Sequence, residues 1–133
     1  MFVNCCHCRD CQRQTGSAFV INAIIEADRV VVSGEEPVAI QVPTDSGRPH
    51  LIHRCRSCQV ALWSIYGGRH QVRFVRVGTL EDPTALQPDA HIFTRSKLPW
   101  VILPASAPAF EVYYEMNQLW PAASLERRKA LFG

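Results

Sequence analysis

Cysteine spacing constrains the fold of this 133-residue chain more than any other feature. Cys6, Cys8 and Cys11 lie within six residues, and Cys55 and Cys58 form a second close pair. Such spacing suits a metal ion better than disulfides, because C-x-C and C-x-x-C segments can fold around one zinc ion and give it two or three thiolate ligands. Four protein ligands are typical of structural zinc, whereas three ligands and one exchangeable position are typical of catalytic zinc. The first group supplies three ligands and the second supplies two, so these cysteines do not complete two closed sites.

Composition narrows the class of protein. No apolar run approaches the roughly 18 residues of a membrane span, and the N-terminal residues do not have the basic and apolar regions of a secretory signal. We therefore expect a cytoplasmic protein with no membrane partner, in which clustered cysteines bind metal or react more often than they cross-link. The net charge of +2 argues against a zinc ribbon that binds nucleic acid. The C-x-x-C pair also lacks the βαβ context of a redox dithiol protein.

The hydrophobic pattern predicts a mostly-β chain. Short runs rich in β-branched residues alternate with turn formers, and the absence of a long amphipathic helix between them disfavours a βαβ fold. The expected strands cover residues 18–25, 29–32, 38–42, 60–66 and 72–77. Helical signals are scarce until Ser124, which could cap a short helix over residues 124–131. We expect a sandwich or folded sheet with a cysteine-rich loop and a C-terminal helix.

Four segments together resemble a known family. They are CHCRDCQRQTGS at residues 6–17, CRSC at 55–58, GTLEDP at 78–83 and KLPWV at 97–101. This combination is similar to the glutathione-dependent formaldehyde-activating enzyme family, and the resemblance extends from residue 4 to about residue 114. It implies the β-rich Mss4-like fold and one domain of this type over residues 1–133.

The resemblance also implies two zinc sites. Cys6, Cys8 and Cys11 match the three ligands of the family's active-site zinc. Cys55 and Cys58 match the later half of a structural site with four cysteines, whose earlier half is a C-x-C near the N-terminus. That earlier C-x-C is not in this sequence. We expect that the true start lies upstream of residue 1, so that the chain is truncated relative to the family; the alternative is that half of the structural site has been lost.

The function that the resemblance implies is a carbon–sulfur lyase reaction with glutathione as co-substrate. The thiol of glutathione, or of a related small molecule, would approach the fourth position of the zinc, which deprotonates a coordinated thiol. Attack on formaldehyde or another small aldehyde would give an S-hydroxymethyl adduct. Three anionic ligands weaken zinc as a Lewis acid, so we expect thiol activation to matter more than carbonyl polarisation. Asp10 or His7 could transfer the proton, or both could be structural neighbours.

Residues beside the first cluster are candidates for binding glutathione. The turn around Gly16 and Ser17 could offer backbone donors to a carboxylate, or it could be only a tight turn. Arg13 could offset the charge of −1 that three thiolates and one zinc ion carry, or it could be a solvated surface charge. Phe93 and Trp100 could line the site or belong to the core.

Other interpretations remain open at this point. Cys5 is most simply a spare thiol, or it could substitute as a ligand. His53 could stand in as a ligand because it lies two residues before the second cysteine pair. The alternative function is a zinc-stabilised binding or chaperone-like module without catalysis, since many small proteins use zinc for folding alone.

Overall fold

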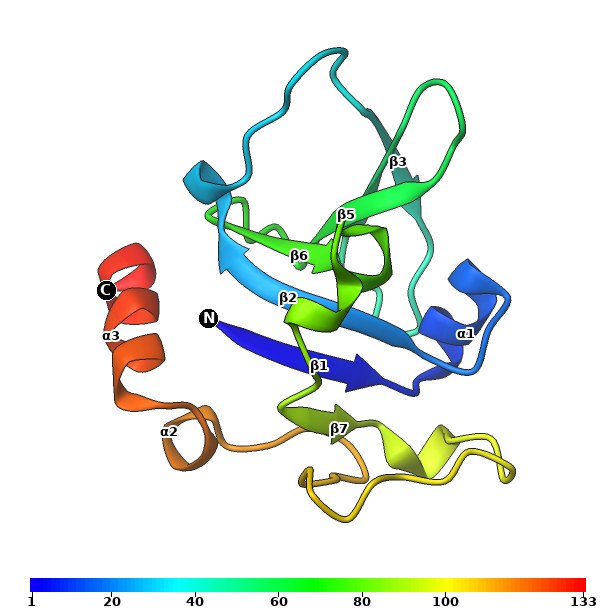
Figure 1. Ribbon diagram of the computed structural model, residues 1–133, viewed down its shortest axis with the longest axis vertical. Helices are drawn as coiled ribbons and strands as arrows, with labels where there is room; N and C mark the ends of the chain where they lie inside the picture. Colours follow the sequence, from blue (N-terminus) through cyan, green and yellow to red (C-terminus); the bar gives the residue numbers. More distant parts are fainter.

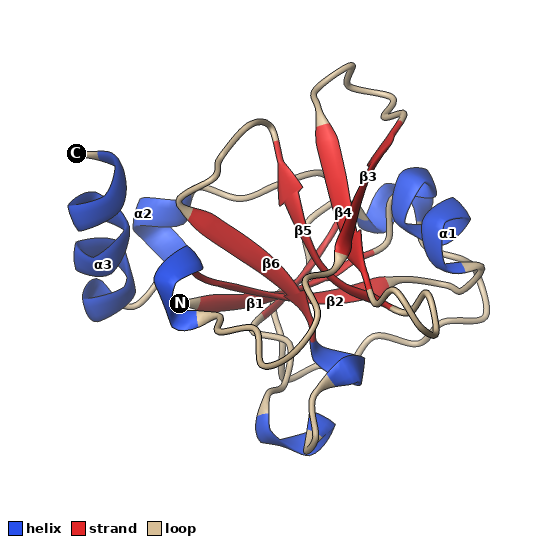
Figure 2. Cartoon of the chain, turned by 90° about the horizontal axis from the view of Figure 1, so that it is seen from above, coloured by secondary structure: helices blue, strands red, loops and turns tan.

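A single seven-stranded sheet dominates the structure, a computed structural model that describes residues 1–133. The strands lie in the order β3-β4-β5-β6-β2-β1-β7, and all neighbours are antiparallel except β1 and β7. Their bounds are β1 Phe2–Cys6, β2 Val20–Glu26, β3 Val38–Val42, β4 His50–Arg54, β5 Ala61–Tyr66, β6 Val72–Arg76 and β7 Ala90–Ile92. In Figure 2, β3 and β4 run at a steep angle to β1 and β2. The predicted mostly-β class is confirmed, and the folded sheet is consistent with the Mss4-like fold.

Helices lie at the two ends of the sheet (Figure 1). They are α1 Arg9–Thr15, α2 Met116–Leu119 and α3 Ala122–Phe132. Three short 3-10 helices lie between strands, at Ala27–Arg29, Val77–Thr79 and Pro83–Ala85, and a fourth, Thr94–Ser96, follows β7. The predicted C-terminal helix is confirmed as α3, although it begins at Ala122. Pro121 precedes it with φ of −56°, which prepares the chain for a helix, while the Ser124 hydroxyl donates to the Met1 carbonyl at 2.7 Å. No helix is long and apolar enough to cross a membrane.

Two expectations about local structure are wrong. The cysteine-rich segment is not a loop, because Cys8 caps helix α1 with its sulfur and Gly16 ends the helix in the left-handed region with φ of 63°. The run at residues 29–32 is not a strand, because a 3-10 turn ends at Arg29 and leaves Val31 exposed to solvent. The cysteine-rich segment is helical because local hydrogen bonds form there. Residues 29–32 are not a strand because no neighbouring strand pairs with them.

The two faces of the sheet are covered differently. On one face, Phe2 stacks on Trp120 at 5.2 Å between ring centroids, and side chains of α3 pack against the same cluster. On the other face, Val3, Ala23 and Val77 form a smaller apolar cluster. Because successive residues of a strand point to opposite faces, β1 divides its side chains between the two. The first face continues past its apolar part to the cysteines.

Candidate functional site

The first cysteine group is assembled from two elements that meet. Cys6 ends strand β1, Cys8 caps α1, and Cys11 lies in the first turn of that helix. Their three sulfur atoms all lie within 4.8 Å of one another, and the backbone N–H of Cys11 donates to the sulfur of Cys8 at 3.4 Å. Thiolates that share one zinc ion at about 2.3 Å lie about 3.8 Å apart in a tetrahedron. The cluster could therefore hold a metal ion.

The electrostatics of the cluster also favour a cation. Contacts with Cys11 and Cys8 raise the pKa of the Cys6 thiol, and burial raises it further. The same kind of contact, with Cys11 and then Cys6, lowers the pKa of Cys8. One sulfur therefore ionises readily while a neighbour keeps its proton, since adjacent thiolates repel each other. A divalent cation removes that repulsion, because coordinated thiols are deprotonated.

The three cysteines line a cavity of about 740 Å³ whose other walls are rich in arginine. The arginines that line it are Arg9, Arg48, Arg69, Arg76 and Arg95. The guanidinium of Arg69 lies 5.3 Å from the ring centroid of Phe74 and forms no ion pair. Burial lowers the pKa of Arg69, but an arginine stays charged at neutral pH. We expect this cavity to attract anionic ligands.

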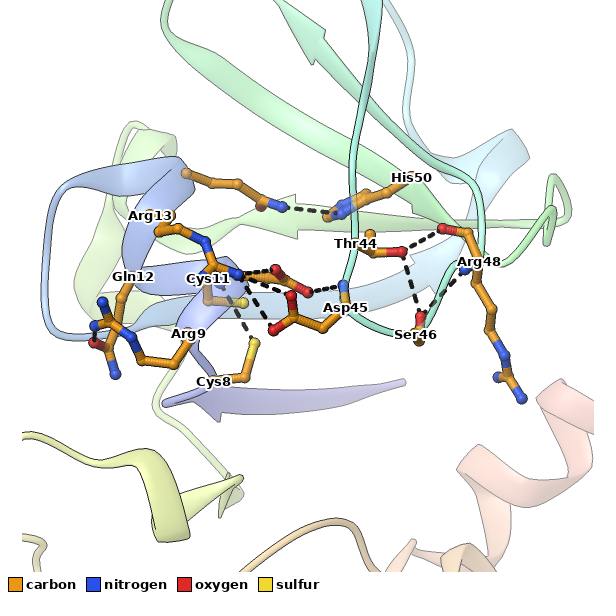
Figure 3. A network of polar contacts seen from close by, with 12 residues as sticks. Cys8, Arg9, Cys11, Gln12, Arg13, Thr44, Asp45, Ser46, Arg48 and His50 are labelled. Atoms are coloured by element: carbon orange, nitrogen blue, oxygen red, sulfur yellow. Dashed lines mark hydrogen bonds and ion pairs between the residues drawn. The ribbon is translucent and has the colours of Figure 1, made fainter.

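The acidic residues of the same cavity are already engaged. Arg13 pairs with Asp10 at 2.6 Å and with Asp45 at 3.1 Å, and the backbone N–H of Asp45 donates to Asp10 at 3.0 Å. Figure 3 shows this network beside Cys8 and Cys11. It ties helix α1 to the loop between β3 and β4. Asp10 therefore holds neighbouring groups in place. Of its two predicted roles, proton transfer and structural neighbour, this network supports the second.

The predicted glutathione-binding residues border a different hollow. Arg13, Gly16 and Ser17 line a hollow of about 420 Å³ together with Trp100, whose side chain is 71% exposed. Among its lining residues only Arg9 also borders the cysteine cavity. The structure therefore does not bring these residues to the three sulfurs.

Phe93 is placed differently from Trp100. It lines the cysteine cavity itself and has a left-handed backbone with φ of 55°. Sequence reasoning grouped the two aromatic residues, because both lie in the same region of the chain. Only Phe93 lies against the candidate site.

The second cysteine pair stands apart from the first. Cys55 and Cys58 occupy the turn after β4, where Cys58 is exposed and Cys55 is half-buried. Backbone hydrogen bonds from Cys58 and then Ser57 lower the pKa of Cys55. No third cysteine, histidine or carboxylate joins this pair in a possible metal group. His53 instead stacks on Trp63, with ring centroids 5.2 Å apart.

A further group of metal-ligating atoms was not predicted from the sequence. Cys5, His7 and His91 have ligand atoms within 4.8 Å of one another, and all three side chains are buried. His7 Nε2 lies 3.0 Å from His91 Nδ1 and 3.6 Å from the sulfur of Cys5. Because β1 alternates its side chains, this group lies on the opposite face of the sheet from Cys6. His7 does not line the cysteine cavity, and burial lowers its pKa to about 4.

The floor of the cysteine cavity holds polar side chains that sequence reasoning also missed. They come from five strands: Asn4, Asn22, His50, Ser64 and Arg76. Burial and then the charge of Arg76 lower the pKa of His50 to about 4, so this imidazole is neutral at pH 7. The available signal was the polar residue inside an otherwise apolar run, as at Asn22.

One family model matches most of the chain. The family model of the glutathione-dependent formaldehyde-activating enzyme (GFA) matches residues 1–96, which include both cysteine groups. The chain belongs to the GFA family. No match was found among curated proteins. Membership of the GFA family supports a glutathione-dependent, formaldehyde-activating or related function on small-molecule substrates, and the cysteine cluster could hold the metal ion that such a function uses.

Proposed function

We propose that this member of the GFA family joins a small thiol, glutathione or a related molecule, to formaldehyde or another small aldehyde. A bond forms between the thiol sulfur and the carbonyl carbon, and the thiol proton goes to the carbonyl oxygen. The product is an S-hydroxymethyl thiol or its homologue, and the reverse reaction is that of a carbon–sulfur lyase. The observation that carries this proposal is the meeting of three cysteine sulfurs on the wall of a cavity lined by arginines.

Cys6, Cys8 and Cys11 are the residues that would hold zinc. Zinc bound there would lower the pKa of an approaching thiol and make it a nucleophile at neutral pH. The chain's own residues bind and orient the two small molecules. The arginines of the cavity would attract an anionic thiol, and Phe74 and Phe93 would give it an apolar wall to pack against.

The remaining predicted site residues have subsidiary parts in the proposal. Arg13, Gly16 and Ser17 would hold the distal part of glutathione, since Arg9 lines both their hollow and the cysteine cavity, which makes the two neighbours. Cys55 and Cys58 would contribute two ligands to a metal ion and need others to complete its coordination.

Exchange spectroscopy on glutathione and formaldehyde tests the proposal. The adduct forms without a catalyst, so the expected result is exchange faster than this background in the presence of zinc-loaded protein. Cys8→Ser should abolish the acceleration, whereas Cys58→Ser, which removes an exposed sulfur outside the cavity, should retain it. If zinc-loaded wild-type protein gives only the background rate with glutathione and with other small thiols, the enzyme proposal is wrong and a zinc-stabilised binding module is the better description.

A further inference from the structure

A row of polar side chains crosses three neighbouring strands beneath the cysteine cavity. Asn4 of β1 pairs with Asn22 of β2, which pairs with Arg76 of β6. Side chains paired in register point to the same face of a sheet, and this is the face of Cys6. Asn4 is 4% and Arg76 is 7% exposed, although buried positions on a sheet are normally apolar. All members of the row line the cavity.

Arg76 is the least satisfied member of this row. Its Nη1 donates to Asn22 Oδ1 at 2.6 Å, which fixes the orientation of the guanidinium. Its Nε and Nη2 are buried and make no hydrogen bond to any protein group, and no carboxylate pairs with it. A buried charge without a partner is costly to a fold, so its retention needs a functional or structural reason.

Another arginine of the same chain shows how the Nε and Nη2 edge of a guanidinium binds a carboxylate. Arg127 donates from Nε to Glu26 Oε1 and from Nη2 to Glu26 Oε2, both at 2.6 Å. This is the fork in which two parallel N–H groups match the two oxygens of a carboxylate. In Arg76 the same two nitrogen atoms have no protein carboxylate to bind. The acidic residues that line the cavity, Asp10 and Asp45, are held by Arg13 instead.

The three sulfurs and Arg76 line the same cavity. One small molecule could therefore present a thiol to the cysteine cluster and an anionic group to the floor. A two-oxygen anion fits the fork of Arg76 better than a single alkoxide oxygen does.

We propose that the Nε and Nη2 edge of Arg76 binds a carboxylate of the thiol substrate, with Asn22 as the residue that positions the guanidinium. The substrate class is thereby narrowed to thiols that carry a carboxylate, a class to which glutathione belongs. This inference rests on the proposed function, because it assumes that a thiol enters the cysteine cavity.

Binding of a matched pair of thiols tests the inference without measuring catalysis. The probes are 3-mercaptopropionate and 3-mercaptopropanamide, which differ only in the charge and second oxygen of one end. Titration calorimetry on the zinc-loaded wild-type chain should give tighter binding of the acid than of the amide. In Arg76→Gln, affinity for the acid should fall roughly tenfold to hundredfold and affinity for the amide less than about threefold.

Matched variants separate the effect of the two-nitrogen contact of Arg76 from the effect of its charge and from the effect of misfolding. Arg73→Gln alters an arginine of the same strand on the opposite face and should leave both affinities within about twofold. Arg76→Lys keeps the charge without the fork, so it should recover only part of the affinity for the acid. The zinc content of each variant shows that the cluster is intact.

The possible failures are distinguishable. Equal binding of the acid and the amide by wild-type protein overturns the inference even if no Arg76 variant folds, and it leaves the proposed function standing. The inference is likewise overturned if Arg76→Gln loses both thiols equally while retaining zinc. If the zinc-loaded wild-type chain binds neither these thiols nor glutathione, the proposed function fails and this inference fails with it.

Discussion

The chain contains the same C-x-x-C spacing twice, in two very different surroundings. Cys8 and Cys11 begin helix α1 and have a third sulfur, that of Cys6, supplied by the end of β1. Cys55 and Cys58 lie in an exposed turn after β4 and gather no further ligand. The comparison shows that a C-x-x-C pair alone gathers two sulfurs, whereas a third cysteine two residues earlier, at the end of β1, completes a group of three.

The two groups also differ in how their surroundings change the pKa of their thiols. Neighbouring thiols and burial raise the pKa of Cys6, while backbone N–H groups lower that of Cys55. The first effect comes from crowding of like groups in the interior, and the second comes from local donors at the surface. A cation would therefore favour ionisation of Cys6, whose own surroundings oppose it. Four predictions test this difference.

The largest expected effect is on metal affinity. Replacing Cys11 by serine exchanges a soft thiolate for a poor neutral ligand. Zinc affinity should fall by roughly 100-fold or more, since changes that only touch the surroundings of a ligand already cost about 10–100-fold. Cys58→Ser should change the affinity of the first site less than about threefold. Competition with a chromophoric chelator measures both, and equal losses in the two variants would contradict the comparison.

The second prediction concerns pH. Thiolates bind zinc, so the thiol protons of the first group leave when the metal binds. Apparent affinity should therefore rise with pH and fall as the pH is lowered, by about tenfold per pH unit for each proton released. The slope should be the same in Cys58→Ser as in wild type. Repeating the chelator competition between pH 6 and pH 8 gives the number of protons, and an affinity independent of pH would show that the cluster is ionised before metal arrives.

Stability should respond to metal removal through the first group. A ligand present at 100 times its Kd stabilises the folded state by about 2.7 kcal/mol. Chelation should accordingly lower the midpoint of thermal unfolding by several degrees in wild type and in Cys58→Ser. Cys11→Ser should start lower and lose little more on chelation. If chelation lowers the midpoint only in proteins that retain Cys58, the stabilising metal ion is bound by the exposed pair instead.

The smallest effect is expected from modification of the exposed pair. Cys58 is exposed, and its sulfur lies outside the cysteine cavity. Alkylation of this thiol on zinc-loaded protein should leave the zinc bound by Cys6, Cys8 and Cys11, and the rate of thiol exchange, within about twofold of the unmodified values. Mass spectrometry after limited treatment with iodoacetamide identifies the modified residue. A clear loss of exchange after modification of Cys58 alone would show that the two groups are coupled.

Much of the fold could be predicted from the sequence. β-branched runs indicated the strands that became β2, β3, β5 and β6, and the late helix was expected near its observed position. Spacing also indicated the triad of Cys6, Cys8 and Cys11, whose sulfurs do lie together. Both signals are local, so they can be read without knowing which strands pair.

The features that escaped prediction depend on capping or on long-range pairing. Helix α1 has seven mostly polar residues and no apolar period, and it forms because Cys8 caps one end and Gly16 ends the other. The approach of His91 to His7 needs the parallel pairing of β1 with β7. The role of Arg76 depends on the register of three strands, since a polar residue in a strand otherwise indicates partial exposure.

The position of β1 has a consequence for the order in which the site folds. Strand β1 pairs on one side with β2, which follows closely in the chain, and on the other with β7, in which Ile92 lies beside Cys6. The backbone N–H of Val3 also donates to Asp89 at 2.8 Å. Ribosomal synthesis proceeds from the N-terminus, so Cys6 leaves the ribosome long before these partners exist. Loop closure over such sequence separations is slow compared with helix formation. The nascent chain therefore carries incompletely enclosed thiols until residues 89–92 have been made. During that interval the cell must protect these thiols from oxidants and stray metal ions, because the fold does not yet do so.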